Sequence, residues 1–229
     1  MKVQILNYTR FPEETVAQAA RLCYSNKTID QLKEETAEEK NDIIIKKIMK
    51  LGHYSVLEHV SFTFGIEDIS RITSHQLVRH RIASFSQKSQ RYVKLGKKQN
   101  HITPKSIRNN NSDLLLKFQE LSQSCFSFYR EMLAQGIPAE DARYILPQSV
   151  TTSIIFTANA RELIHFFRLR CCNRAQWEIR ELAISMLKLV KEIAPHIFQD
   201  SGPSCLIGPC PEGEMTCGKP WSREQSGNN

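Results

Sequence analysis

The sequence predicts an α+β protein with a single domain, in which helices flank a central sheet of mixed or antiparallel strands. Three observations support this class. The chain has 229 residues, a length that suits one large domain with a buried core. Hydrophobic residues make up 41% of the chain and charged residues 24%, which is typical of globular proteins and excludes wholesale disorder. Helical and strand-like segments also follow one another irregularly, without an internal repeat.

The first part of the chain is predicted to hold two strands and two helices. Apolar residues alternate around Val3 and Ile5 and predict a short strand. A helix is expected to begin at Pro12, because proline is well tolerated in a first helical turn. Residues 31–51 are acidic at the start and rich in lysine at the end, which predicts a second helix with Gly52 after its last turn. The alternation around Phe62 predicts a strand over 60–66.

The middle of the chain is less regular. Asp68 is expected to cap a helix that reaches about residue 78. The polar residues after position 81 lack helical periodicity and predict extended chain or a loop, and residues 97–112 are expected to form an exposed excursion. A long amphipathic helix is predicted over 114–135, ended by Gly136 and Pro138. Its apolar residues, such as Leu121 and Phe128, are expected to face the core.

The last part of the chain contains a short predicted helix over 138–145 and a β-branched strand over 150–157. Two helices are expected near 160–169 and 175–194. Residues 1–200 are therefore predicted to form the domain, and residues 201–229, which contain cysteine, glycine and proline, a C-terminal extension.

The compartment is predicted from the apolar runs and the cysteines. No apolar run approaches the roughly 18 residues that a membrane span needs. The N-terminus turns polar at Asn7, too early for the apolar part of a secretory signal. The chain has seven cysteines, an odd number that argues against a disulfide framework. We therefore expect a reduced, cytoplasmic protein that does not associate with membranes.

The positive charge of the chain is local. The net charge is +7, and residues 69–112 contain no Asp or Glu. This segment holds these basic residues: Arg71, Arg79, Arg81, Lys88, Arg91, Lys94, Lys97, Lys98, Lys105 and Arg108. Such a concentration favours an anionic ligand at one site. A nucleic-acid groove and a solvated basic face are the alternatives.

Residues 79–92 are the best candidates for an anion site. If the chain is extended here, Gln87, Ser89 and Arg91 point to one side, because side chains alternate along an extended chain. Amide, hydroxyl and guanidinium donors are the groups that bind phosphate, and arginine does so through bidentate hydrogen bonds. Arg79 and Arg81 could close the same pocket.

Four segments resemble one enzyme family. The triplet Arg79-His80-Arg81, followed after seven residues by Ser89, resembles the signature of the flavin-dependent thymidylate synthases. Three further segments resemble the same family in the same order: residues 52–59 (GHYSVLEH), residues 142–147 (ARYILP), and residues 159–180, which contain NAR, LR and AQWEIR. The resemblance spans roughly residues 1–198. It implies a mixed fold of helices and sheet, assembled as a homotetramer whose active sites are shared between subunits.

The resemblance also implies an activity. Members of this family methylate deoxyuridine monophosphate (dUMP) to thymidine monophosphate (dTMP), take the carbon from methylenetetrahydrofolate, and take the hydride from FAD that NADPH has reduced. The resemblance implies contact with FAD for these matching residues: Ser55, Arg79, His80, Arg81, Gln87, Asn159, Arg161 and His165. Those that imply contact with the nucleotide are Gln76, Arg79, Gln87, Ser89, Arg91, Arg143 and Arg170.

Two of these residues have further implied roles. His53 would lie near the flavin and the folate. Arg170 would be catalytic, because a fixed guanidinium stabilises negative charge that develops on the pyrimidine ring. Ser89 has no base near it in the sequence, so we interpret it as a hydrogen-bond donor to the substrate.

Two positions depart from the family pattern. Gln87 stands where many members have Glu, so no acid–base role is assigned to it. His165 replaces an Asn, and its two interpretations are a ligand of the flavin and a histidine on a helix surface. His53 and His59 do not have the spacing of a zinc-binding helix pair, and no metal is predicted in the active site.

The cysteines leave alternatives open. Cys171 and Cys172 are interpreted as buried packing residues and not as the thiolate that the other class of thymidylate synthase uses. The tail with Cys205, Cys210 and Cys217 is expected to be a flexible extension, with a redox site, or a metal site completed by a residue such as His196, as alternatives.

Two functions compete with the flavoenzyme. The first is a nucleic-acid-binding protein, but the chain has no motif of a known nucleic-acid-binding fold and few aromatic residues in its basic segment. The second is a family member that has lost its activity. We therefore expect small-molecule partners and no nucleic acid.

Overall fold

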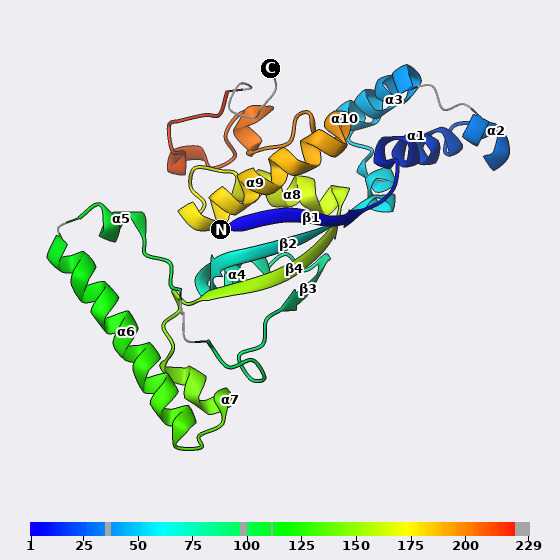
Figure 1. The fold of residues 1–229 in the computed structure, drawn as a ribbon. Helices are drawn as coiled ribbons and strands as arrows, with labels where there is room; N and C mark the ends of the chain where they lie inside the picture. The colour runs from blue at the N-terminus through cyan, green and yellow to red at the C-terminus, as the bar shows by residue number, and fades with distance from the viewer. Residues whose placement is uncertain (35–37, 97–99, 111, 223–229) are drawn as a thin grey trace. The chain divides into compact units, whose positions relative to one another are not determined.

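The computed structural model describes residues 1–34, 38–96, 100–110 and 112–222. Lys97, Lys98 and Asn111 lie outside the described residues. The chain forms one sheet of four strands, β1 (Lys2–Tyr8), β2 (Ser61–Ser70), β3 (Ala83–Gln87) and β4 (Thr151–Asn159), in the order β1-β2-β4-β3 (Figure 1). The sheet is antiparallel. Together with its helices, it confirms the predicted α+β class.

The described residues group into two compact units, and strand residues contribute to both. The first unit contains residues 1–2, 66–79 and 85–155, and the second contains residues 3–65, 80–84 and the chain from 156 onward. No helix among the described residues is long and apolar enough to cross a membrane.

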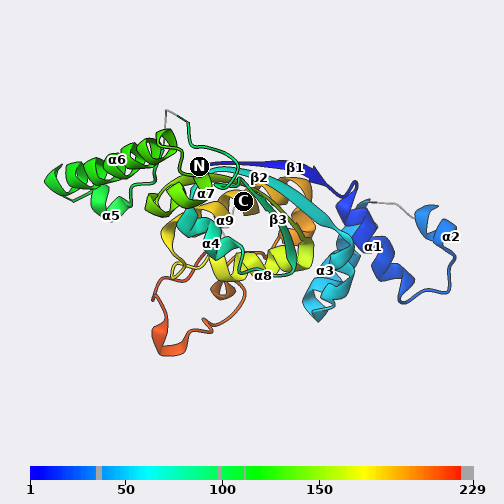
Figure 2. The same cartoon turned by 90° about the horizontal axis from the view of Figure 1, so that it is seen from below.

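The second unit contains most of the helices. They are α1 (Pro12–Leu22), α2 (Ile29–Glu34), α3 (Glu38–Leu51), η1 (Tyr54–His59), α8 (Ala160–Arg170), α9 (Trp177–Ile193), α10 (Pro195–Phe198), η3 (Ser204–Leu206) and η4 (Gly213–Met215). Helices α1 and α3 lie side by side (Figures 1 and 2). The helix predicted over 31–51 is thus two helices, and residues 35–37 between them lie outside the described part of the chain.

An aromatic core holds the second unit together. Phe62 on β2 packs edge-on against Phe198, with ring centroids 5.6 Å apart, and Phe64 stacks on Phe156 of β4 at 6.0 Å. Phe156 in turn contacts Phe166 of α8. All five rings are almost completely buried, and full burial of such a side chain contributes about 1.5–3 kcal/mol. The alternation that predicted β2 therefore reflects one buried face.

Glycine ends helix α3 as predicted. Gly52 has a φ of 72°, a left-handed conformation that residues with a Cβ rarely adopt. The amide of His53 donates to the carbonyl of Ile48 at 3.0 Å, and that of Gly52 to Met49 at 3.3 Å. This pair of hydrogen bonds is a Schellman motif, and it directs the chain into His53 and η1.

The prediction that Asp68 caps a helix is wrong. Strand β2 continues to Ser70, because Ile66 and Ile69 are buried, and Asp68 adopts a φ of 56° inside it. The cap is Ser70, whose hydroxyl accepts a hydrogen bond from the amide of Thr73 at 3.1 Å. Helix α4 then covers Arg71–Leu77.

The first unit contains α4, α5 (Lys105–Arg108), α6 (Ser112–Ala134), α7 (Ala139–Ala142) and η2 (Arg143–Ile145). The long helix α6 was predicted, but the burial of its apolar side is not as predicted. Only Ser122, Phe126 and Tyr129 are buried, whereas Leu121 is 69% exposed and Phe128 49%. The described chain thus leaves an apolar side of α6 uncovered.

Candidate active site

Three buried or half-buried side chains of the second unit form a hydrogen-bonded relay. His80 Nδ1 lies 3.1 Å from Glu162 Oε1, and Arg170 Nε donates to His80 Nε2 at 3.0 Å. His80 lies just before β3, whereas Glu162 and Arg170 lie on α8. The relay therefore joins the Arg79-His80-Arg81 motif to the candidate catalytic arginine.

The hydrogen bonds define the protonation state of His80. Since Arg170 Nε is a donor, His80 Nε2 must accept, and the ring proton resides on Nδ1 and is donated to Glu162. Burial, followed by the charges of Arg170 and His165, lowers the pKa of His80 to about 4. His80 is therefore neutral at neutral pH, with one tautomer selected by its partners.

Glu162 belongs to the site although the sequence analysis did not select it. Asn159 caps α8 by accepting a hydrogen bond from the amide of Glu162 at 2.9 Å. In a capping box, a Glu at this position would reach back to the backbone amide of the cap residue. Here it is buried against His80, and burial raises its pKa. The pattern Asn159-x-x-Glu162 was the available signal, but it predicts a helix start and not a partner.

His165 lies next to this relay. Its ring centroid is 6.0 Å from that of His80, and the ligand atoms of His80, Glu162 and His165 all lie within 4.8 Å of one another. Such a group could hold a metal ion, but the guanidinium of Arg170 already occupies His80 Nε2. This adjacent positive charge opposes binding of a cation, so the group is better described as a hydrogen-bond relay.

Glu162 and His165 line a cavity of about 520 Å³ in the second unit. Asn159 and Arg161, two further candidates for FAD contact, line it as well, together with Tyr54, Glu58, Ile82, Ile164 and Arg168. The guanidinium of Arg161 pairs with Glu58, and Arg168 donates to the hydroxyl of Tyr54 at 3.2 Å. The cavity thus presents two positioned guanidinium groups beside apolar surface. Ser55 and Arg81 are exposed and lie next to lining residues in the sequence, but they do not line this cavity themselves.

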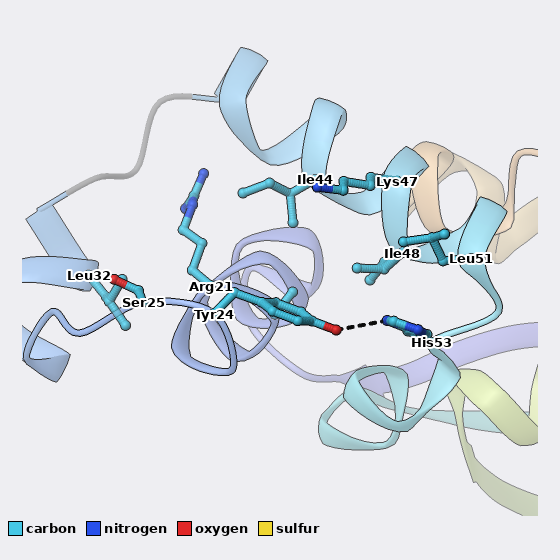
Figure 3. Close-up of a pocket in the computed structure, with 10 residues that line it drawn as sticks. Arg21, Tyr24, Ser25, Leu32, Ile44, Lys47, Ile48, Leu51 and His53 are labelled. Atoms are coloured by element: carbon cyan, nitrogen blue, oxygen red, sulfur yellow. Dashed lines mark hydrogen bonds between the residues drawn. The ribbon is translucent and has the colours of Figure 1, made fainter.

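His53 lines a different cavity, of about 400 Å³ (Figure 3). Its Nδ1 is 3.0 Å from the hydroxyl of Tyr24, and the two rings are stacked. The wall is largely apolar, from Leu32, Ile44, Ile48 and Leu51 among others, and Arg21 and Lys47 add positive charge. Arg170 lines a third cavity, of about 300 Å³, with residues of the C-terminal segment.

Most of the nucleotide candidates, including Gln87 and Arg143, belong to the first unit. The amide nitrogen of Gln87 donates to Ser74 at 2.9 Å and to Thr152 at 3.3 Å. Strand β3 ends at Gln87, and the carbonyl of Ser89 accepts from the amide of Val93 in a turn. The predicted row of Gln87, Ser89 and Arg91 along one extended edge is therefore wrong. Gln76 is half-buried and Arg79 exposed at the end of α4.

Two arginines of the first unit repel each other. Burial and the nearby charge of Arg143 lower the pKa of Arg71, which the sequence analysis counted as basic but did not place in a site. The carboxylate of Glu140 forms an ion pair with Arg91 at 2.9 Å. Arg143 donates a hydrogen bond to the backbone carbonyl of Glu140 and not to its carboxylate. An anionic group such as a phosphate would stabilise two neighbouring guanidinium groups of this kind.

The low pKa of His80 predicts sensitivity to acid. Between 6.5 and about 4, the unfolded chain binds a proton at this residue that the folded chain does not. The contribution of neutral His80 to the free energy of unfolding is therefore complete above about pH 6.5, and it is lost as the pH falls toward 4. Glu162, whose pKa is raised, opposes part of this change. We expect the urea midpoint to fall more steeply in this range for the wild type than for His80→Asn. Equal pH dependence of the two proteins would contradict the prediction.

Comparisons with known proteins identify the family of the chain. Residues 4–196 match the family model described as thymidylate synthase complementing protein. The flavin-dependent thymidylate synthase of Geobacter sulfurreducens is 57% identical over 220 residues, which cover 96% of this chain and 94% of that protein. The flavin-dependent thymidylate synthase of Clostridium tetani is 48% identical over 96% of this chain and 94% of that protein. The enzyme of Sulfolobus acidocaldarius is 44% identical over 90% of this chain and 79% of that protein. The chain therefore belongs to the family of flavin-dependent thymidylate synthases.

Proposed function

We propose that this enzyme converts dUMP to dTMP, with methylenetetrahydrofolate as carbon donor and with FAD, reduced by NADPH, as the source of the hydride. Among the structural observations, the hydrogen-bonded relay from Glu162 through His80 to Arg170 supports this proposal most directly. It orients a half-buried guanidinium through its Nε.

Arg170 is the proposed catalytic residue. Burial lowers its pKa, but a guanidinium remains charged at neutral pH. A fixed positive charge that faces the uracil ring stabilises negative charge as it develops there, which makes the ring carbon a better nucleophile. Glu162 and His80 act through Arg170 and are positioning residues. Because His80 is neutral, it accepts from Arg170 without adding a competing positive charge.

The first unit supplies the proposed phosphate contacts. Arg71 and Arg143 are close enough for the charge of one to lower the pKa of the other, and Gln87 is oriented by Ser74 and Thr152. These groups suit a nucleotide monophosphate, whose dianion would relieve the repulsion between the two guanidinium groups. Gln76, Arg79, Ser89 and Arg91 are further proposed contacts that lie nearby in the sequence.

FAD fits the cavity of about 520 Å³ by the chemistry of its lining. Arg161 is held by Glu58, and Arg168 by Tyr54, so both guanidinium groups are positioned to bind a diphosphate. Asn159 and His165 add hydrogen-bonding groups beside the apolar Ile82 and Ile164. When bound, the flavin supplies hydride transfer. We propose Ser55 and Arg81 as further contacts of the flavin in this unit. For Arg79, His80 and Gln87, a contact with FAD is proposed from the family resemblance alone.

The cavity that His53 lines has the chemistry of a folate site. Flat aromatic rings suit an apolar wall with the stacked Tyr24 and His53, and the carboxylates of a folate tail suit Arg21 and Lys47. His53 is thus proposed as a contact for the carbon donor.

No cysteine is proposed as a nucleophile. Burial raises the pKa of Cys171 to about 12, so this thiol does not ionise at neutral pH, and a thiolate is the reactive form. Cys171 is fully buried and packs in the core. The burial of Cys171 therefore supports a route in which this cysteine forms no covalent bond with the nucleotide.

We further propose a homotetramer in a reduced, cytoplasmic setting. The exposed apolar side chains of α6, including Leu121 and Phe128, favour burial against other copies, because large exposed apolar patches mark interaction surfaces. Light scattering is expected to give four chains per particle. A fully active monomer would contradict this assembly.

An absorbance spectrum tests the proposed function. The purified enzyme is expected to bind FAD, with a flavin spectrum that NADPH bleaches, and to produce dTMP when dUMP and methylenetetrahydrofolate are added. Steeply salt-dependent binding to random DNA without flavin binding would instead favour the nucleic-acid-binding alternative.

A further inference from the structure

Four cysteines surround one cavity outside the proposed catalytic residues. Cys172, Cys205, Cys210 and Cys217 all line a cavity of about 270 Å³ in the second unit. All four are half-buried free thiols. We propose that they bind one Zn²⁺ ion, which fastens the C-terminal segment to the end of α8.

The ligand types and their placement suit zinc. Four thiolates are a frequent ligand set for structural zinc, and the ligands usually come from short turn-rich loops. Three of the cysteines lie within residues 205–217, a segment with left-handed Gly213 at a φ of 53°, and Gly218 follows Cys217 at a φ of 66°. The fourth cysteine, Cys172, comes from the turn that follows α8.

Hydrogen bonds hold the sulfur of Cys217 in place, and its thiol donates to the carbonyl of Lys219 at 3.5 Å. Its sulfur accepts from the backbone amide of Lys219 at 3.4 Å, and from the side-chain amide of Asn173 at 3.9 Å. Hydrogen-bond donors around a ligand atom orient it, and such second contacts are typical of metal sites. Asn173 also donates to the carbonyl of Lys219 at 3.0 Å, so it joins the two ligand-bearing segments.

The C-terminal segment has few other means of staying folded. Between residues 204 and 222 it contains only the single turns η3 and η4, and most of its side chains are exposed or half-buried. Small irregular segments without a core commonly depend on a metal or on disulfides. Arg174 adds a link, through Glu212 at 2.8 Å and the carbonyl of Met215. Its charge would also partly neutralise a zinc–thiolate centre.

Two other residues are excluded as ligands. Cys171, adjacent to Cys172, is fully buried and does not line this cavity. The suggestion from the sequence that His196 supplies the fourth ligand is wrong. Its Nδ1 lies 2.7 Å from Glu13 and its Nε2 3.5 Å from Asp42, and it does not line this cavity.

Zinc binding would draw the sulfurs inward. Among the described residues, no three of these sulfurs lie within 4.8 Å of one another, whereas each sulfur in a zinc site lies about 2.3 Å from the ion. Rotation of half-buried cysteine side chains between staggered positions can supply part of this movement. Each thiol that binds the ion gives up its proton to solvent, so binding is favoured by rising pH.

The site also has a consequence for the active site, which rests on the proposed function. Cys172, Cys205 and Cys210 line the neighbouring cavity of about 300 Å³ together with Arg170. Zinc would thus hold one wall of the space in which the guanidinium of Arg170 lies.

Metal analysis of the full-length enzyme tests the proposal. The protein is purified after growth with added zinc, and zinc per chain is measured by mass spectrometry beside flavin content. We expect one Zn²⁺ per chain in the wild type and in the controls Cys23→Ser and Cys125→Ser, and loss of zinc in Cys205→Ser, Cys210→Ser and Cys217→Ser. Cys172→Ser should behave in the same way, and the tail variants remain informative if it does not fold.

Two outcomes would overturn the zinc site. One is a wild type without zinc after dialysis against excess zinc. The other is zinc retained at one per chain in Cys217→Ser. In the first case, an intact mass that is lower by two hydrogen atoms for each pair of these cysteines would show that disulfides have formed instead. Flavin content separates this result from the proposed function, because a zinc-free enzyme that binds FAD and makes dTMP contradicts only the zinc site.

Discussion

Replacing Arg170 by alanine is expected to lower turnover by about 10²–10³-fold, the usual effect of removing one preorganised donor that stabilises developing charge. Arg170 Nε is anchored on His80 at 3.0 Å, so the group is positioned before substrate binds. Lysine should restore little activity, because it supplies a point charge without the planar donors. Turnover is measured with saturating dUMP and methylenetetrahydrofolate.

Flavin content provides the control for this variant. The guanidinium of Arg170 does not line the cavity that contains Asn159, Arg161 and His165, so FAD binding should persist in Arg170→Ala. Near wild-type turnover in this variant would exclude Arg170 as the catalytic residue. Loss of the flavin together with turnover would mean that Arg170 supports the fold of the cofactor site instead.

Replacing Glu162 by glutamine is expected to lower turnover by about 5- to 150-fold, the range that corresponds to 1–3 kcal/mol for a disturbed buried hydrogen bond. Glutamine has nearly the same size, but its amide can either accept from or donate to His80 Nδ1. The tautomer that lets His80 Nε2 accept from Arg170 is then no longer enforced. The loss should appear mainly in kcat, because Glu162 acts through the orientation of Arg170.

Glu162→Asp and the double variant Glu162→Gln/Arg170→Ala distinguish a positioning role from a structural one. Aspartate keeps the charge and should restore part of the turnover. In the double variant, the effects of the two substitutions should not add, because both remove the same oriented guanidinium. Additive effects, or an unchanged kcat with a lower stability, would show that Glu162 only stabilises α8.

Local structure was largely predictable because it depends on short-range rules. Pro12 at a helix start, Gly52 after a helix end and alternating phenylalanines on β2 each act through neighbours within a few residues, and the structure confirms all three. Asp68 shows where this reasoning fails. Both Asp68 and Ser70 can cap a helix, and the burial of Ile69 in the strand decided between them.

The sequence by itself determined the α+β class, the family, and the chemical character of the ligands, because motif order and local charge are properties of the chain alone. Only the tertiary structure decided which residues meet. Glu162 contacts His80 across 82 positions of sequence, Cys172 and not His196 faces the tail cysteines, and Leu121 remains exposed on α6. The physical reason is that periodicity predicts which side of an element is apolar, whereas the partner of a buried polar group depends on how distant segments pack.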